Sequence, residues 1–278
     1  MDFSRAIELA QLVNAAYSIA PNDLTNSAGT VFNSSGSSYV VVTTIYAFDL
    51  KTDMNPARGN IQVSIGLILQ AVGSGDVVIA IRGTEGILEW IADAEFLLKN
   101  CPFLAGAGQT EDGFTDMYSS LCTGSAANSP SVVNSLSTLP FPQPASSLTI
   151  CGHSLGGALA TLLALDVAAN TTFKTPTVFT YASPRTGDPT FAGKYNQVVP
   201  NTFRIVNRTD LVPRLPFPPL YEHVDAVFEL NPVQFVPFPP RLLVKLTVPC
   251  AHALNTYLFL LTIAAGGAVL PLDQACAP

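Results

Sequence analysis

Residues 148–158, LTICGHSLGGA, join an apolar β-strand to a helix through one tight turn. The run 148–151 predicts a buried strand, and a helix is expected over 156–169. Glycines stand two residues before and after Ser154, because a strained strand-to-helix turn leaves no room there for side chains. The turn lifts the Ser154 hydroxyl beside a helix N-terminus, which favours negative charge. The stretch predicts a nucleophilic serine; an ordinary strand-to-helix turn is the alternative.

Strands and helices alternate on both sides of this turn. Strands are expected at 39–48, 61–72, 76–82, 177–181 and 202–206, and helices at 1–20 (capped by Asp2) and around 114–122. Near-continuous apolar strands separated by helices indicate an α/β fold whose sheet is largely buried. With 278 residues, the chain is expected to form one domain, 1–278.

The region 213–240 is unusual because it contains eight prolines and five Phe or Tyr residues. Proline has no N–H to donate to a neighbouring strand, so a central strand is excluded there. Apolar surface loops are expected instead.

Charge is sparse in this chain. Thirteen basic and 20 acidic residues give a net charge of −7, which argues against binding to nucleic acid. No run of Lys or Arg exists that would hold an anionic membrane. Only 12% of the residues are charged, where roughly a quarter is usual, so a rather apolar exterior is expected.

Neither end of the chain reads as a membrane segment. Residues 246–272 carry no Asp, Glu, Lys or Arg, but the helical core 254–265 is too short to span a bilayer. A buried C-terminal helix and no transmembrane span are expected. Residues 1–20 lack a basic start, and Arg5 and Glu8 interrupt their apolar stretch, so no signal peptide is expected in this chain.

The five cysteines show no metal-binding spacing such as C-x-x-C, and neither a metal nor an organic cofactor is expected. Cys151 lies in an apolar strand and is expected to be a buried thiol. The other four allow three pairings, of which Cys101–Cys122 with Cys250–Cys276 is the expectation. In a cytosolic protein all five would instead be reduced core residues.

A nucleophilic serine needs a base, and the base needs a third group that orients it. The chain has only three histidines. His153 adjoins Ser154, so its side chain should point away from the serine and pack in the core. His223 and His252 are the candidates for the base.

The carboxylate candidates are Asp166, Asp188 and Asp210, with Asp225 possible only for His252. Asp166 lies in the middle of a predicted helix and is interpreted as solvated, and Asp188 lies in a turn sequence. Asp210 is favoured because it follows the strand 202–206, and in open α/β sheets the carboxyl ends of the strands carry the sites.

Several further motifs occur in a fixed order along roughly residues 77–257. They are IRGT (81–84), WIAD (90–93), GF (113–114), GHSLGGALA (152–160), SPRTGD (183–188) and RIVNRTDLVP (204–213). Together they closely resemble the fungal-type (class 3) lipases. The resemblance implies an α/β-hydrolase fold and hydrolysis of carboxylic esters, typically triacylglycerols. It implies Ser154 as nucleophile, Asp210 as orienting carboxylate and His252 as base.

The sequence departs from the family pattern at two places. Asp225 follows the YEHV stretch 221–224 where the family usually has glycine. Asn255 stands three residues after His252, where family members often have tyrosine, and Tyr257 comes later.

An ester attacked by serine becomes an oxyanion, which needs two preorganised donors. The backbone N–H of Leu155, the residue after the nucleophile, is one of them. By resemblance, Thr84 supplies the other with its N–H and hydroxyl. Thr84 is alternatively, or in addition, the N-cap of a helix.

Residues 85–93 have an apolar and a polar side when placed on a helical wheel. Ile87, Leu88, Trp90 and Ile91 share one arc, and three acidic residues lie opposite. A surface helix packed on the core is one interpretation. The resemblance implies a lid that covers the site until it meets a lipid interface.

The sequence therefore predicts a serine ester hydrolase, in the first place a triacylglycerol lipase that works through an acyl-enzyme. Its partner would be a lipid or other apolar ester at an oil–water interface. A monomer is assumed, and secretion is implied by the resemblance. The alternatives are an esterase for small or aromatic (feruloyl-like) esters and, from another class, a non-catalytic lipase-like interaction protein.

Overall fold

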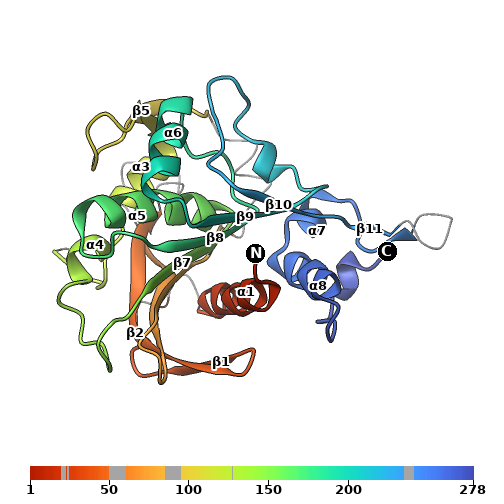
Figure 1. The fold of residues 1–278 in the computed structure, drawn as a ribbon, viewed down its shortest axis with the longest axis horizontal. Coiled ribbons are helices and arrows are strands. Elements are labelled where there is room, and N and C mark those ends of the chain that lie inside the picture. The colour runs from red at the N-terminus through yellow and green to blue at the C-terminus, as the bar shows by residue number, and fades with distance from the viewer. Residues whose placement is uncertain (20–22, 24, 50–60, 85–94, 127, 235–240) are drawn as a thin grey trace.

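A central sheet organises the computed structural model, which describes residues 1–19, 23, 25–49, 61–84, 95–126, 128–234 and 241–278. Within these residues the sheet has eight strands in the order β1-β2-β3-β4-β7-β8-β9-β10 (Figure 1). Their bounds are β1 (Val31–Ser34), β2 (Ser37–Asp49), β3 (Ile61–Ala71), β4 (Val77–Ile81), β7 (Leu148–His153), β8 (Thr177–Tyr181), β9 (Thr202–Asn207) and β10 (Val227–Leu230).

The sheet combines an antiparallel and a parallel part. Strands β1 to β4 pair antiparallel, whereas β4, β7, β8, β9 and β10 all pair parallel with their neighbours. Ile81 at the end of β4 lies opposite Gly152, and His153 lies opposite Tyr181. The carboxyl ends of the parallel strands therefore meet at one edge, and the predicted α/β fold with a largely parallel sheet is confirmed.

Helices cover both faces of the sheet (Figure 1). Helices α1 and α8 pack together on one face, and α3, α4, α5 and α6 lie on the other. The bounds are α1 (Phe3–Tyr17), α3 (Asp112–Ser119), α4 (Val132–Ser135), α5 (Leu155–Asn170), α6 (Pro189–Val198), α7 (Val248–His252) and α8 (Leu254–Ala265). Each face has its own hydrophobic core, one beneath α5 and one beneath α1 and α8.

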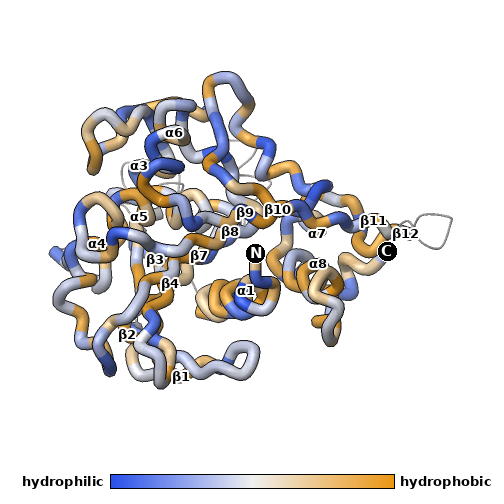
Figure 2. Tube along the Cα trace, in the orientation of Figure 1, coloured by the Kyte–Doolittle hydropathy of each residue, from blue (hydrophilic) through white to orange (hydrophobic). Residues whose placement is uncertain are grey.

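Three of these helices follow the sequence closely. Asp2 caps α1, as predicted, by accepting a hydrogen bond from the N–H of Ser4 at 2.9 Å. Helix α5 is buried along nearly its whole length, as its continuous run of small and apolar residues requires. The apolar character of α8 is visible in Figure 2. This helix is buried along most of its length, as predicted.

The region 213–240 differs in part from its prediction. It contains the short helix η2 (Val212–Arg214) at its start and strand β10, which pairs with β9 at the edge of the sheet. Residues 227–230 contain no proline, so their N–H groups are free to pair. Among the described residues no central strand forms there, as predicted. The expectation that the region consists of surface loops was wrong for the residues of β10.

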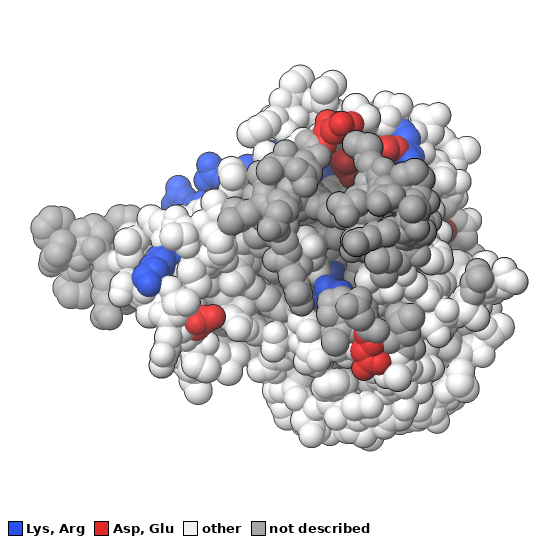
Figure 3. Space-filling view, turned by 180° about the vertical axis from the view of Figure 1, so that it is seen from behind, with Lys and Arg blue, Asp and Glu red and all other residues white. Residues whose placement is uncertain are grey.

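Two small antiparallel pairs and a terminal turn complete the description. They are β5 (Leu98–Asn100) with β6 (Gln109–Glu111), β11 (Val233–Gln234) with β12 (Arg241–Leu242), and η3 (Gln274–Cys276). Across the part of the chain that the structure describes, every helix is too short or too polar to cross a bilayer. Charged side chains are few and scattered on the face seen in Figure 3.

The cysteines follow the prediction only in part. Cys250 and Cys276 form a disulfide, and Cys151 is a free, fully buried thiol, both as predicted. The Cys101–Cys122 pairing was wrong, because both thiols are free and buried. Their surroundings differ: the N–H of Cys122 bonds the carbonyl of Tyr46 in β2, whereas Cys101 belongs to the loop of the β5–β6 hairpin.

Candidate active site

The turn between β7 and α5 holds Ser154 in a strained conformation. Its φ of 59° and ψ of −128° lie where residues other than glycine are rare. A Cβ atom on Gly152 would lie 2.1 Å from the carbonyl oxygen of Gly156, and one on Gly156 would lie 2.3 Å from that of Ile81. The two glycines are therefore required sterically, and the predicted strand-to-helix turn that leaves no room for side chains is confirmed.

Three side chains that are far apart in the sequence meet at this turn. The Ser154 hydroxyl lies 2.8 Å from Nε2 of His252, and Nδ1 of His252 lies 2.9 Å from Oδ2 of Asp210. All three are at least 95% buried. Ser154 comes from the start of α5, Asp210 from the loop after β9, and His252 from the end of α7.

The direction of these hydrogen bonds follows from their chemistry. An ionised carboxylate only accepts, so Nδ1 of His252 carries the hydrogen toward Asp210. In the neutral ring Nε2 is then an acceptor, and the Ser154 hydroxyl donates to it. The arrangement makes His252 ready to take the serine proton, as a general base must be.

Asp210 is held by two further donors. Its Oδ1 accepts the N–H of Val212 at 3.0 Å, and its Oδ2 accepts the hydroxyl of Tyr257 at 2.8 Å. The Tyr257 oxygen in turn accepts the N–H of Asn207, at the end of β9, at 2.9 Å. Burial and the charge of Asp210 raise the pKa of Tyr257 well above its usual value, so its hydroxyl keeps its hydrogen.

Tyr257 was not predicted to be a site residue. The only signal in the sequence was a tyrosine five residues after His252, rather than at the third residue as in the family pattern. The structure explains how Tyr257 reaches Asp210: the hydroxyl comes from the fourth residue of α8, which begins two residues after His252.

Two backbone segments flank Ser154, the start of α5 and the end of β4. Leu155 is the first residue of α5, so its N–H has no acceptor within the helix. On the other side, the end of β4 packs closely against the turn: a Cβ on Gly83 would lie 2.8 Å from Cβ of Ser154. Thr84 is the next residue, half-buried, and this packing puts it beside the serine.

The other candidates lie outside this cluster. Nε2 of His223 donates to the carbonyl of Pro213 at 2.6 Å, and burial lowers the pKa of His223 to about 3. Asp188 caps α6 by accepting the N–H of Phe191 at 2.7 Å. Asp225 hydrogen-bonds Asn196.

Asp166 was interpreted wrongly as a solvated residue. It is buried between α5 and its neighbours, where its carboxylate accepts hydrogen bonds from the Tyr118 hydroxyl and the Asn170 side chain. A carboxylate in a helix that is buried on nearly all sides needs such partners, because unpaired burial of a charge is costly.

The segment expected to form a lid lies outside the described residues. Ile87, Leu88, Trp90 and Ile91 all belong to 85–94, so their arrangement stays a prediction.

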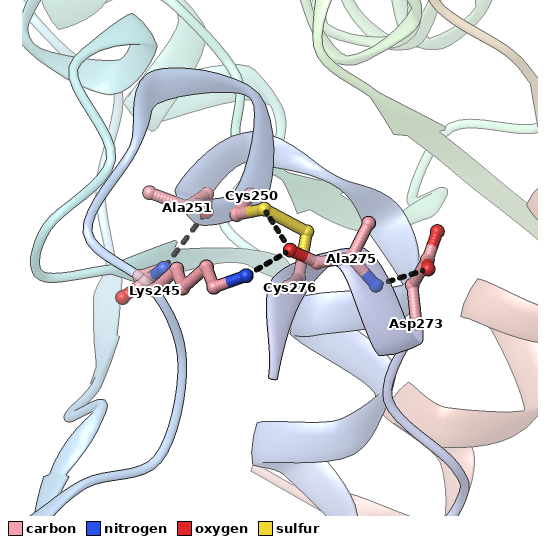
Figure 4. Close-up of a disulfide and its surroundings, with 7 residues drawn as sticks. Lys245, Cys250, Ala251, Asp273, Ala275 and Cys276 are labelled. Carbon is pink, nitrogen blue, oxygen red and sulfur yellow. Dashed lines mark hydrogen bonds between the residues drawn. A yellow bond between two sulfur atoms is a disulfide. The ribbon is translucent and has the colours of Figure 1, made fainter. Parts of the chain in front are cut away.

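A disulfide fastens the helix that carries His252. Cys250 lies two residues before His252 in α7 and is bonded to Cys276 in the C-terminal turn (Figure 4). The Nζ of Lys245 donates to the carbonyl of Ala275 at 2.9 Å, and its backbone N–H donates to that of Cys276 at 3.0 Å. The C-terminal segment therefore braces the short helix that ends on His252.

Comparisons with known proteins agree with this geometry. The family model described as "Lipase (class 3)" matches residues 78–219. A phospholipase A1-II 1 of Oryza sativa subsp. indica is 34% identical over 161 residues, which cover 53% of this chain and 41% of the relative. A secreted mono- and diacylglycerol lipase A of Penicillium cyclopium is 34% identical over 153 residues, covering 55% and 47%. The chain thus spans less than half the length of these curated relatives.

Solved structures share the fold. A mutant form of MDLA from Penicillium cyclopium superposes with a TM-score of 0.61 at 24% identity, covering 81% of this chain and 78% of that one. A lipase from Rhizopus microsporus var. chinensis gives 0.51 at 22% identity, covering 69% and 61%. At such identities the superpositions establish the α/β-hydrolase fold alone. Because the family model matches more than half of the chain, the chain belongs to the class 3 lipase family.

Proposed function

We propose that this protein is a carboxylic ester hydrolase that cleaves fatty-acyl esters of glycerol through an acyl-enzyme on Ser154. The observation that carries the proposal is the buried chain of hydrogen bonds from Ser154 through His252 to Asp210, at 2.8 and 2.9 Å. A non-catalytic interaction protein would not need a strained serine in contact with an oriented base, because strain of this kind costs roughly 1–3 kcal/mol.

In the proposed reaction, Ser154 Oγ attacks the ester carbonyl carbon while Nε2 of His252 takes the hydroxyl proton. The N–H groups of Leu155 and Thr84 stabilise the oxyanion that forms. His252 then gives its proton to the departing alcohol oxygen as the ester C–O bond breaks. Water, deprotonated by the same nitrogen, attacks the acyl carbon. As the bond from this carbon to Ser154 Oγ breaks, His252 returns the proton to Oγ, which releases the fatty acid and the free serine.

The substrate class rests on the relatives and on the surface. The relatives named above are a phospholipase A1 and a mono- and diacylglycerol lipase, so their names indicate phospholipids and acylglycerols. Triacylglycerol, the sequence-based expectation, belongs to the same class. We propose acylglycerols and phospholipids together as the substrate class. A comparison of the rates of hydrolysis of these lipids ranks them.

An apolar rim of exposed side chains supports a lipid substrate. The rim consists of Leu97, Leu211, Phe217 and Leu220, which are 57%, 37%, 65% and 67% exposed. Leu211 directly follows the proposed orienting aspartate, and the Tyr221 hydroxyl donates to the carbonyl of Leu97 at 3.0 Å, so the loop that carries Leu220 lies against the segment that carries Leu97. Exposed apolar patches of this kind mark binding surfaces for apolar partners.

The lid is proposed from the sequence pattern of 85–93 alone. If its apolar arc covers Ser154 in water, an oil–water interface that receives this arc should open the site. Replacing Ile87 and Ile91 together by Ser should then flatten the rise of activity at the solubility limit and spare soluble esters. An unchanged rise in this variant would exclude the lid.

We also propose that the protein is secreted and acts as a monomer. The Cys250–Cys276 disulfide supports an oxidising compartment, and the Penicillium relative is itself secreted. The monomer is tested by the mass in size-exclusion chromatography with light scattering.

A panel of esters tests the proposed function. We expect hydrolysis of p-nitrophenyl esters, emulsified di- and triacylglycerols and phosphatidylcholine vesicles by the wild type, with no activity in Ser154→Ala. Rapid hydrolysis of methyl ferulate without activity on any long-chain glycerol ester would replace the proposal by the aromatic esterase. Full activity in Ser154→Ala would overturn it.

A further inference from the structure

A chain of hydrogen bonds through Tyr17 and His153 runs beneath the site. The N–H of Gly83 lies 2.8 Å from the Tyr17 hydroxyl oxygen. That hydroxyl lies 2.8 Å from Nδ1 of His153, whose Nε2 lies 2.8 Å from the backbone carbonyl oxygen of His252. Tyr17 ends helix α1, so a residue from the start of the chain reaches both segments that flank Ser154.

Chemistry fixes the position of every hydrogen in this chain of bonds. A carbonyl oxygen only accepts, so Nε2 of His153 carries the hydrogen that points at His252. Burial lowers the pKa of His153 well below its usual value, and the nearby His252 lowers it further, so the ring is neutral and Nδ1 accepts. The Tyr17 hydroxyl therefore donates to His153, and its oxygen accepts the N–H of Gly83.

The hydrogen-bond chain ends on two backbone groups, the N–H of Gly83 and the carbonyl of His252, which lie next to the proposed reacting atoms. Gly83 precedes Thr84, and its Cα is packed so tightly that an added Cβ would lie 2.7 Å from the Tyr17 hydroxyl and 2.8 Å from Cβ of Ser154. At the other end, the His153 ring lies beneath the His252 ring with their centroids 4.8 Å apart. These hydrogen bonds thus connect the backbone segment before the proposed oxyanion donor to the backbone of the proposed base.

Fixing helix α1 to the sheet does not require these bonds. Helix α1 packs through buried apolar side chains such as Leu9, Leu12 and Val13, which lie in the core beneath α1 and α8. Tyr17 stands at the end of that helix and is only half-buried. Its hydroxyl contributes polar contacts to Gly83 and His153 that the apolar packing of the helix does not supply.

We propose that Tyr17 and His153 are positioning residues, which hold the Gly83–Thr84 backbone and the His252 backbone in register with Ser154. This inference rests on the proposed function, because it assigns a role in ester hydrolysis to the backbone segments at both ends of the hydrogen-bond chain. The role that we assign to each residue is exerted through the backbone segment that it holds, and not by proton transfer.

The test compares Tyr17→Phe with a matched control, Tyr195→Phe. Tyr195 is fully buried in α6, and its hydroxyl bonds Thr202 at 3.0 Å on the other face of the sheet, so the control removes the same atom elsewhere. With a soluble p-nitrophenyl ester we expect kcat of Tyr17→Phe to fall about 10-fold with KM unchanged. Tyr195→Phe should keep the wild-type kcat while its melting temperature falls at least as far.

Two His153 variants separate the hydrogen bonds from packing. A glutamine can still donate to the His252 carbonyl, so His153→Gln should retain more kcat than His153→Leu. In His153→Leu the Tyr17 hydroxyl keeps its bond to the N–H of Gly83 but loses its bond to the ring, so adding Tyr17→Phe should cause a smaller loss of kcat than it does in the wild type. Independent, multiplicative losses in the double variant would overturn the inference, and so would a Tyr17→Phe kcat equal to that of Tyr195→Phe.

The comparison of kcat between Tyr17→Phe and Tyr195→Phe tests the positioning role of the Tyr17 hydroxyl even if His153→Leu does not fold. Failure of the proposed function is recognised separately, either by activity in Ser154→Ala or by hydrolysis of methyl ferulate without activity on long-chain glycerol esters. An inactive Ser154→Ala beside a fully active Tyr17→Phe would overturn this inference alone.

Discussion

One added methyl group, in Gly156→Ala, tests how closely the parts of the site must fit. A Cβ at this position would lie 2.3 Å from the carbonyl oxygen of Ile81 and 2.5 Å from that of Arg82, whereas ordinary contact begins at 3.4 Å. Both oxygens belong to the backbone, so no change of side-chain rotamer relieves the clash. The end of β4 and the start of α5 must therefore separate by about 1 Å.

This separation moves the two proposed oxyanion donors apart, since Thr84 follows β4 and Leu155 starts α5. A displacement of about 1 Å at a catalytic group costs on the order of 10²-fold in rate. Overpacking of a close contact costs roughly 1–3 kcal/mol of folding free energy. We expect Gly156→Ala to fold with a lower melting temperature and a kcat about 10²-fold lower on a soluble p-nitrophenyl ester.

Gly193→Ala is the matched control. Gly193 lies within α6, and a Cβ there meets nothing within 4 Å. The same substitution should stabilise this helix by about 0.4–1 kcal/mol and leave kcat unchanged. If Gly156→Ala had a kcat within about twofold of Gly193→Ala, the close contact between β4 and α5 would not position the oxyanion donors, and the reasoning would be refuted.

Three further predictions concern the carboxylate, the disulfide and acid stability. Asp210→Asn should lower kcat by about 10⁴-fold, less than Ser154→Ala, because an amide favours the wrong His252 tautomer; steady-state kinetics with unchanged folding would check this, and near-wild-type kcat would contradict it. Cys276→Ser should lower the free energy of unfolding by about 3–4 kcal/mol, because the disulfide closes a loop with a sequence separation of 26. Urea unfolding should show the same loss in the reduced wild type, and a reductant should not change the stability of the variant. His223 has its folded-state pKa lowered to about 3 by burial, below that of the unfolded chain, so the unfolded state gains a proton first and stability should fall as the pH drops below about 6.5. His223→Gln should make this decline shallower in thermal unfolding from pH 7 to 4, and an identical slope would exclude the histidine as its source.

Much of the site was predictable because its chemistry is local. The glycines around Ser154 indicate a turn that leaves no room for side chains, and the structure shows the close backbone contacts that require these glycines. Asp210 was predictable from its place after a parallel strand. With only three histidines in the chain, the base was narrowed to two residues, and the family resemblance favoured His252.

The remaining site residues act through contacts that sequence spacing does not reveal. Tyr17 is separated from His153 by 136 positions, and Tyr257 from Asp210 by 47. Their hydroxyl groups matter because of which backbone and carboxylate atoms the fold brings beside them. A tyrosine near one end of a helix has no distinguishing pattern in a single sequence.

Burial and pairing were the other sources of error. Asp166 looked solvated because an acidic residue in a helix usually is, but α3 and α4 cover that side of α5. Cys101 and Cys122 are near in sequence, yet Cys101 lies in the loop of the β5–β6 hairpin and Cys122 lies beside β2. Residues 227–230 formed a strand because the prolines of the region lie on either side of them.

The central claim, that Ser154 is a nucleophile activated by His252 and Asp210, is tested most directly by a serine-directed alkyl phosphonate. Intact-protein mass spectrometry should show one phosphonyl group per chain, peptide mapping should place it on Ser154, and labelling should proceed in parallel with the loss of esterase activity. Ser154→Ala should stay unlabelled, and Asp210→Asn should react more slowly. An esterase-active protein that the reagent leaves unlabelled at Ser154, or that is inactivated by a label on another residue, would contradict the account.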